Sequence, residues 1–296
     1  MAEGSIVVRL LYLAYSDQTA KSLPAGFELV DNRENARSDW FEYWPIRNFL
    51  LLQDLDSLGL IGFFSPRFNK KTGLSAHQIR DFINRSQQSV RGCNDIKTNS
   101  EVFIFSPQPE IVGLFRNPFY AENFFSPGFL SVSQRTFDEI GIRVALNEMV
   151  NDLQTTVYSN YIVASGRFWK SWLEITEKIF ALCELNEPKA REIGLLNSTN
   201  YPLGAQKKVF LIERIATLLL TVNPEWNPKA YFPFRFPSSE VFAEFRNEAL
   251  VCDALKRSYL TTGESSYIEL FDRISGTVLA NVLRKTGLAE VTSIID

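Results

Sequence analysis

Residues 58–68 read LGLIGFFSPRF, and this stretch decides the fold class. Its first part is a short, continuously apolar run, which is typical of a strand covered on both faces. Pro66 follows directly, and because proline cannot donate to a sheet ladder, it ends a central strand. Strands of this kind predict an α/β protein, in which helices cover both sides of a sheet.

Similar apolar runs and helical spacings alternate along the rest of the chain. Further buried strands are predicted at SIVVRLLYLA (5–14), EVFIF (101–105) and NYIVAS (160–165). The spacing of apolar residues predicts helices over 75–88 with Ser75 as N-cap, over 131–153 with Ser131 or Ser133 as cap, and over 166–185, 207–222, 238–257 and 266–286.

The order of these elements predicts one domain over 1–296, with an α/β core (1–205) and a mainly helical C-terminal part (206–296). Pro45 leaves one boundary open. It either begins a helix over 45–53 or kinks a longer helix that starts near Ser38.

Composition excludes several classes of protein. The net charge is −3, so no global basic field attracts nucleic acid. Cys93, Cys183 and Cys252 are far apart and predict free thiols in a reducing compartment. His77 is the one histidine, which excludes a His-rich zinc site, and we expect it on the surface. No signal peptide or membrane-spanning run stands out, so we expect a soluble, cytoplasmic protein.

The phosphate and hydrolase motifs are also missing. No G-x-G-x-x-G, Walker or G-x-S-x-G pattern occurs. Asp54 and Asp56 form a D-x-D, the spacing that can hold a divalent cation against a diphosphate. The pair precedes the strand at 58–64, on the side of the sheet away from the expected crevice, and an acidic turn is the better interpretation.

The tripeptide Phe-Ser-Pro occurs three times, with its serine at Ser65, Ser106 and Ser126. In an open α/β sheet, ligands bind beyond the carboxyl ends of strands, which places Ser65 and Ser106 on that rim. The third copy lies in NPFYAENFFSPGF (117–129), an aromatic loop that is expected to fold over the crevice. The alternative is that Ser-Pro is simply a common way to stop a strand.

Basic residues follow the strand at 58–64 directly. Arg67, Lys70 and Lys71 are placed where cations would neutralise the diphosphate of a sugar nucleotide. A solvated basic loop is an equally good interpretation, because loops are often basic.

Acidic residues beside aromatic rings are the candidate acids and bases. Asp39 and Glu42 share a face if their segment is helical, and neighbouring rings raise carboxyl pKa values and stack on sugars. Acids in a first helical turn are the alternative. Glu122 lies in the aromatic loop as a candidate general base or an exposed acid. Glu213 and Arg214 interrupt an apolar helix, which favours a structural charge pair over a site.

In their order, these motifs resemble a family of bacterial glycosyltransferases that build capsule, O-antigen and exopolysaccharide chains. LLYLAYSD (10–17) is similar to the family's first strand and polar loop, and DNRENARSDWFEYWPIRNF (31–49) to its asparagine-rich turn and acidic-aromatic helix. LGLIGFFSPRF stands where the family has a strand ending in a His-Tyr-Arg-Arg block, of which only Arg67 is matched. SNYIVASGRFWKSWL (159–173) and KVFLIERIATLLL (208–220) are similar to two later segments.

The resemblance covers most of residues 5–222 and implies a GT-A-like (Rossmann-like) mixed sheet flanked by helices. It implies transfer of a hexose from a nucleotide-sugar donor to a hydroxyl of a glycan or lipid-linked acceptor. It implies that Tyr15, Ser16 and Asp17 bind the nucleobase and ribose, and that Arg67 and Lys71 neutralise the diphosphate. It implies that Asp39, Glu42 or Glu122 acts on the acceptor hydroxyl or orients the donor sugar. Further substrate contacts are implied for Tyr43, Ser65, Ser106 and Asn160.

Two points stay open at this stage. No metal ligand is assigned, because no D-x-D stands in the expected place, and a requirement for Mn²⁺ or Mg²⁺ is undecided. A non-catalytic carbohydrate-binding or scaffold module is the alternative function, since it would keep the fold without the missing arginine. A lipid-linked acceptor implies at most peripheral contact with the inner face of the membrane.

Overall fold

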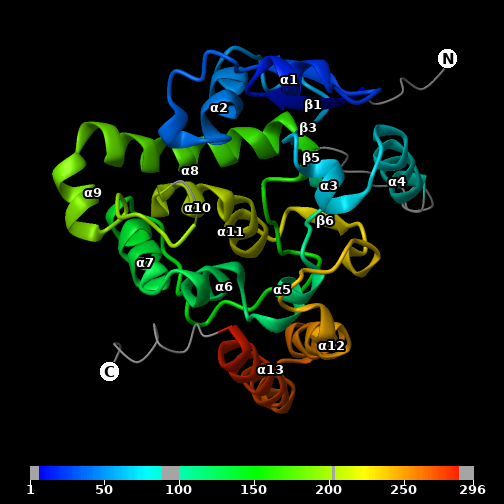
Figure 1. Cartoon of the computed structure of the whole chain (residues 1–296), viewed down its shortest axis with the longest axis vertical. Coiled ribbons are helices and arrows are strands. Elements are labelled where there is room, and N and C mark those ends of the chain that lie inside the picture. The colour runs from blue at the N-terminus through cyan, green and yellow to red at the C-terminus, as the bar shows by residue number, and fades with distance from the viewer. Residues whose placement is uncertain (1–6, 89–99, 202–203, 287–296) are drawn as a thin grey trace.

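The computed structural model describes residues 7–88, 100–201 and 204–286 and shows an α/β protein built on a six-stranded mixed sheet (Figure 1). The sheet order is β2-β1-β3-β5-β4-β6. The strands are β1 (Val8–Ala14), β2 (Glu28–Asp31), β3 (Leu60–Phe64), β4 (Glu101–Ile104), β5 (Ile162–Ser165) and β6 (Asn227–Ala230). All four runs predicted as strands are confirmed, as β1, β3, β4 and β5.

Strand direction determines which chain ends meet. β1 is parallel to β2 and β3, β4 is parallel to β6, and β5 is antiparallel to both of its neighbours, β3 and β4. All strands except β5 therefore run the same way. The carboxyl ends of β1, β3 and β4 and the amino end of β5 consequently lie at one edge of the sheet, where Tyr15, Ser65, Ser106 and Tyr161 adjoin them.

Helices cover both faces of the sheet. Their bounds are α1 (Asp17–Lys21), α2 (Tyr43–Leu51), α3 (Phe68–Thr72), α4 (Ala76–Gln88), α5 (Pro109–Leu114), α6 (Pro118–Phe125), α7 (Phe129–Glu139), α8 (Gly166–Leu185), α9 (Glu187–Ile193), α10 (Lys207–Glu213), α11 (Ile215–Val222), α12 (Arg246–Thr262) and α13 (Ser265–Thr286), with 3₁₀ turns at Ser38–Trp40, Pro233–Arg235 and Ala243–Phe245.

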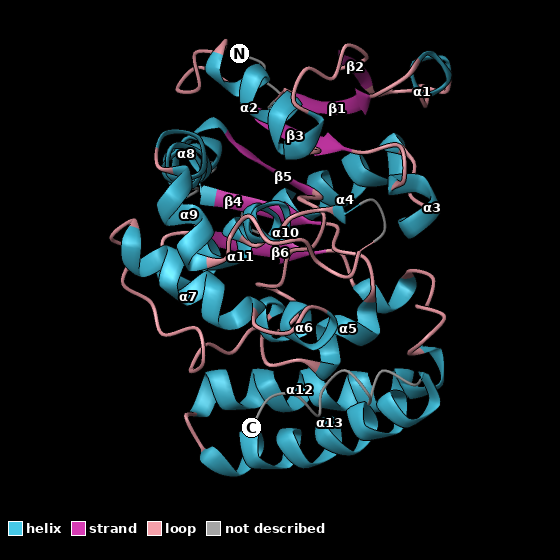
Figure 2. Ribbon diagram, turned by 60° about the vertical axis from the view of Figure 1, so that its left-hand side comes forward, coloured by secondary structure: helices cyan, strands magenta, loops and turns pink. Residues whose placement is uncertain are grey.

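Alternating side chains of β1 show how the layers are held. Leu11 and Leu13 pack in the same core as residues of α2, α8 and α11, whereas Leu10 and Tyr12 pack with residues of α3 and α4. This is the period of two that sends successive strand residues to opposite faces. Figure 2 shows the sheet from its side, with α12 and α13 next to each other at the end of the molecule away from β1.

Several local predictions are confirmed. Ser75 caps α4, because its hydroxyl accepts from the backbone N–H of Gln78 at 3.3 Å. The helix expected over 166–185 is α8, and His77 is exposed on α4. Cys183 and Cys252 are free and buried, while Cys93 lies outside the described residues. Pro45 falls in the first turn of α2, which is separate from the 3₁₀ turn that begins at Ser38.

The helix predicted over 131–153 is wrong in its second half. α7 ends at Glu139, and Gly141 then adopts a φ of 77°. The segment that follows packs on the core without being helical, because Asn117 donates from its side chain to the carbonyls of Leu146 and Met149 at 2.9 and 2.7 Å. The apolar spacing reflects burial against the sheet, and the caps predicted at Ser131 and Ser133 lie inside α7.

The aromatic stretch 117–129 is not a loop but contains a helix, although Ala121, Glu122, Phe125 and Ser126 do line the cleft at the sheet edge. Asn117 caps α6 by accepting from the N–H groups of Phe119 and Tyr120, and Pro118 occupies the first turn. This correction changes the position of Glu122. It is 7% exposed inside the protein rather than in a lid.

The apolar helix predicted over 207–222 is two helices, α10 and α11, which meet at Arg214. The guanidinium of Arg214 donates to the carbonyls of Pro118 and Phe210 and to the Glu122 carboxylate. These contacts satisfy a buried cation. The structural interpretation of Arg214 is therefore supported.

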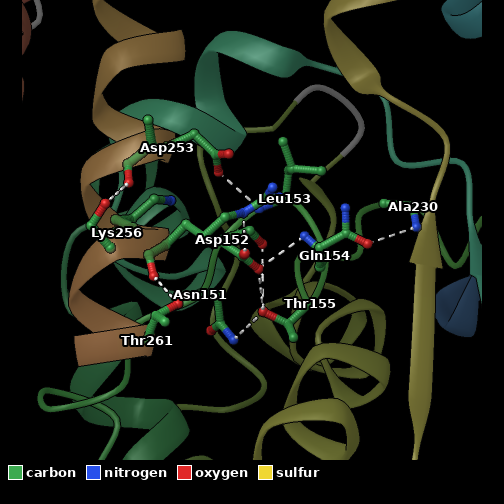
Figure 3. A network of polar contacts seen from close by, with 12 residues as sticks. Asn151, Asp152, Leu153, Gln154, Thr155, Ala230, Asp253, Lys256 and Thr261 are labelled. Carbon is green, nitrogen blue, oxygen red and sulfur yellow. Dashed lines mark hydrogen bonds and ion pairs between the residues drawn. The ribbon is translucent and has the colours of Figure 1, made fainter. Parts of the chain in front are cut away.

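The C-terminal hairpin of α12 and α13 is fixed to the core through α5. Lys256 is completely buried and donates from Nζ to the carbonyls of Val112 and Phe115 at 2.6 and 2.8 Å. Asp253 accepts from the N–H of Leu153 at 2.8 Å, within the polar network of Figure 3. α5 and α12 approach so closely that a Cβ on Gly113 would lie 2.2 Å from a carbonyl oxygen of α12.

Candidate functional site

A cleft of about 1480 Å³ opens at the edge of the sheet where β1 and β3 end. That volume exceeds the roughly 300–1,000 Å³ of a site for one small ligand, so the cleft has room for a large ligand or for two small ones. Seven of the twelve predicted site residues line it, namely Tyr15, Asp39, Glu42, Ser65, Arg67, Lys71 and Glu122.

The other five predicted residues serve the fold around the cleft. Ser16 forms a capping box with Thr19 at the start of α1, and Asp17 is ion-paired with Arg33 at 2.7 Å. Tyr43 is buried and donates to Glu177 at 2.7 Å. These three residues are not part of the cleft wall, so their predicted contacts with a substrate are not supported by the structure.

Ser106 and Asn160 lie behind the cleft surface. Ser106 is 3% exposed, and its hydroxyl accepts from the N–H of Tyr158 at 2.7 Å. The rim position that was predicted for Ser106 is therefore wrong, whereas Ser65 does reach the cleft. Asn160 is 1% exposed and adjoins Ser159, which lines the cleft.

Glu42 is the carboxyl group best suited to proton transfer. It precedes α2 and lines the cleft near Ser65 and Lys71. Burial raises the pKa of Glu42 to about 7, and the carboxylate of Glu213 adds to the rise, against opposing effects of Lys71, Ser65 and Arg67. A pKa near neutrality is what a general base needs at physiological pH.

Asp39 has the opposite character. Burial works to raise its pKa, yet hydrogen bonds from Arg37 and Lys208 outweigh that effect and hold the pKa at about 2. The Nζ of Lys208 lies 2.7 Å from the carboxylate and 4.1 Å from the centre of the Trp40 ring. A carboxylate held so firmly in its ionised, paired state is a poor base and a good anchor for the turn before Glu42.

Glu122 is paired as well. Its carboxylate accepts from Arg214 at 2.6 Å, and both side chains are almost fully buried. Burial raises the pKa of Glu122 although Arg214 opposes the rise. We assign Glu122 mainly to the packing between α6 and α10, because its carboxylate is held by the buried guanidinium of Arg214.

Two cations stand at the carboxyl end of β3. Arg67 is exposed and donates to the Tyr201 hydroxyl at 2.7 Å. Lys71, on α3, donates to the Ser159 hydroxyl at 2.9 Å and lies 5.5 Å from the centre of the Tyr161 ring. Lys70 is exposed and does not line the cleft, so it does not take the place of the second arginine of the family's His-Tyr-Arg-Arg block, which this chain lacks.

Backbone strain is concentrated in the wall of this cleft. Within the described residues, the non-glycine positions with positive φ are Asn35, Phe41, Gln108, Ser159 and Asn160. All of them line the cleft except Asn160, which is bonded to one that does. Such conformations cost about 1–3 kcal/mol each and cluster at ligand sites. Phe41 is the most extreme, with φ 47° and ψ −128°, directly before Glu42.

Sequence reasoning missed several cleft residues, above all Lys208, Glu213 and Ser159. Lys208 and Glu213 stand in an apolar helix, where Glu213 was interpreted as part of a structural charge pair with Arg214 and Lys208 was given no role. Their polarity within a buried stretch was the available signal. Nothing in the local sequence indicates the role of Ser159, because its partner Lys71 is 88 residues away.

No set of three or more His, Cys, Asp or Glu side chains gathers for a metal ion in residues 7–88, 100–201 and 204–286. Asp54 and Asp56 lie in the turn before β3, as expected, and Asp56 is ion-paired with Lys170. In the described part of the chain, no helix has both the length and the apolar character to cross a membrane.

The cleft thus combines the carboxyl group of Glu42, whose pKa is raised, with the cations Arg67 and Lys71 and a strained wall. No protein-family model, no curated protein and no solved structure matches this chain.

Proposed function

We propose that this protein is a glycosyltransferase that moves a sugar from a nucleotide-sugar donor to a hydroxyl of a growing bacterial surface polysaccharide or lipid-linked glycan. The observation that carries the proposal is the position of Glu42, whose pKa is about 7, in one cleft with Arg67 and Lys71. A base and a cation pair in one cavity are the parts that this reaction requires.

The chemistry assigns a role to each group. The Glu42 carboxylate takes the proton from an acceptor hydroxyl while that oxygen bonds to the anomeric carbon of the donor. The bond from this carbon to the diphosphate breaks, and its electron pair stays on the diphosphate oxygen. Arg67 and Lys71 stabilise the negative charge that develops there. Tyr15 borders the same space and is our candidate for contact with the nucleoside.

The fold supports the proposal in a general way. The resemblance implies a GT-A-like mixed sheet flanked by helices, and a six-stranded mixed sheet with helices on both faces agrees with it. The cleft lies beyond the carboxyl ends of strands, which is where open α/β sheets bind ligands. We propose a cytoplasmic location, at the inner face of the membrane when the acceptor is lipid-linked.

The experiment is a screen followed by turnover. Thermal denaturation is measured with a panel of nucleotides and nucleotide sugars, with and without Mn²⁺, because a ligand of the folded form raises the melting temperature. The donor that binds is then tested for hydrolysis and transfer. A flat panel, or a ligand that binds without any turnover, contradicts the enzyme; the second result supports the non-catalytic carbohydrate-binding or scaffold module instead.

Matched variants identify the groups involved. We expect Glu42→Gln to lower turnover by roughly 10²–10⁴-fold, the usual contribution of a general base. Glu34→Gln is its control, since Glu34 is exposed on the preceding loop and outside the cleft wall. Lys71→Met should weaken donor binding, while Lys70→Met, at the exposed neighbouring position, should leave it unchanged.

A further inference from the structure

The turn that leads into β5 is strained at two successive residues. Ser159 has a φ of 59° and Asn160 a φ of 51°. The left-handed region costs a residue with a side chain about 1–2 kcal/mol. The flanking residues fix the turn, because Tyr158 donates its N–H to Ser106 at 2.7 Å and Tyr161 accepts at its carbonyl from Phe105 at 2.8 Å. The strain is therefore imposed by well-bonded surroundings.

The same two residues have unsatisfied backbone donors. The N–H groups of Ser159 and Asn160 make no hydrogen bond to any part of the chain that the structure describes, although the residues are only 8% and 1% exposed. Nearly all buried N–H groups in proteins have a partner. Because Ser159 lines the cleft, a ligand there is within reach of this turn.

Positive charge lies next to these donors. Lys71 places its Nζ 2.9 Å from the Ser159 hydroxyl, and Arg67 lines the same cleft. Backbone N–H groups in a tight turn, together with a lysine, form the chemistry that binds phosphate oxygens. A neutral ligand group would satisfy the amides but would make no use of the positive charge of Lys71.

We propose that the Ser159–Asn160 turn and Lys71 together form a phosphate-binding cradle, in which the N–H of Ser159, at the cleft wall, donates to the anion and the Ser159 hydroxyl positions the lysine. The inference rests on the proposed function only for the identity of the anion, a diphosphate. The cradle itself requires no more than a phosphate or pyrophosphate group.

The test uses inorganic pyrophosphate as the probe, with binding measured by titration calorimetry on the full chain. Ser159→Asp and Ser159→Asn are the matched pair, because both residues tolerate positive φ and differ in charge. Both variants lose the hydroxyl, but only the aspartate pairs with Lys71 and repels the anion, so we expect the affinity of Ser159→Asp to lie about tenfold or more below that of Ser159→Asn. Equal affinities in the two variants overturn the inference.

A second measurement reports on the backbone donors directly. The protein is labelled with ¹⁵N at serine and asparagine, and pyrophosphate is added while amide spectra are recorded. Downfield movement of the Ser159 amide proton supports the cradle. Saturable binding of pyrophosphate that leaves this resonance in place overturns it, as does the absence of binding.

The outcomes separate this inference from the proposed function. Pyrophosphate binding with the expected amide shifts, but without turnover of any nucleotide sugar, supports the cradle and contradicts the transferase. Turnover of a nucleotide sugar with unshifted Ser159 and Asn160 amide resonances supports the transferase and contradicts the cradle.

Discussion

Replacing Glu42 with glutamine should make stability less dependent on pH. A carboxyl group whose pKa rises from 4.5 when unfolded to about 7 when folded binds more protons in the folded state between these values. Stability is then complete below pH 4.5 and is lost as the pH rises through 7. At about 1.4 kcal/mol per pH unit, the loss amounts to about 3 kcal/mol.

Glu42→Gln removes this loss, because the amide stays neutral at every pH. We expect the free energy of unfolding of the variant to exceed that of the wild type by an amount that grows between pH 5 and 8 and then levels off at about 3 kcal/mol. Urea unfolding at a series of pH values measures it, with the slope m checked for constancy. Glu34→Gln is the control and should follow the wild type.

The reasoning is refuted if the difference between Glu42→Gln and the wild type is the same at pH 5 and at pH 8.5. A second variant tests the cause of the shift. Glu213→Gln removes a carboxylate that raises the pKa of Glu42 in the folded state, so the pH at which the loss of stability levels off should move down and the total loss should become smaller. In a transferase, the rising limb of kcat/KM against pH should move down with it.

Three further changes test the fold around the cleft, each by urea unfolding. Phe41→Gly should be more stable than Phe41→Ala by about 1 kcal/mol, because both lose the ring and only glycine relieves the positive φ; equal stabilities would show that the backbone there is unstrained. Glu122→Gln should cost up to about 3–5 kcal/mol, because the buried Arg214 then keeps only the more distant carboxylate of Glu213, at 3.7 Å, and the double variant with Arg214→Met should cost less than the sum. Gly113→Ala should cost about 2 kcal/mol or more by pushing α12 off α5, whereas Gly276→Ala on α13, where a Cβ meets nothing within 4 Å, should be neutral or slightly stabilising.

Local signals account for the parts of the fold that the sequence predicts well. The apolar run before Pro66 becomes β3, and the hydroxyl of Ser75 begins α4 where it was expected. The segment after α7 shows the limit. Leu146 and Met149 have helical spacing, but the side chain of Asn117, far away in the chain, satisfies their carbonyls and the segment is an irregular loop with a turn. Such contacts cannot be read from a window of neighbouring residues.

The residues of the candidate site also fall into those that the sequence predicts and those that it does not. Tyr15, Ser65 and Arg67 were predictable because parallel strands bring their carboxyl ends to one edge, whatever the rest of the fold. Ser16 and Asp17 satisfy the same rule but are taken up by a helix cap and by Arg33. Position relative to a strand end therefore predicts proximity to the cleft, whereas the direction of a side chain depends on competing local partners.

The strained backbone of Phe41 and the raised pKa of Glu42 both cost stability, and both bear on the choice between a transferase and a binding module. Phe41 holds a conformation that is ordinarily restricted to glycine, and the neighbouring carboxyl group is kept where its charged form is disfavoured. Carbohydrate binding needs neither, because an ionised carboxylate accepts hydrogen bonds from sugar hydroxyls at least as well. A general base that works near neutral pH needs a raised pKa. It must also be held at one fixed position relative to the hydroxyl group that loses the proton. Both costs are expected of a catalytic base, which is why turnover, rather than affinity, is the property to measure in Glu42 and Phe41 variants.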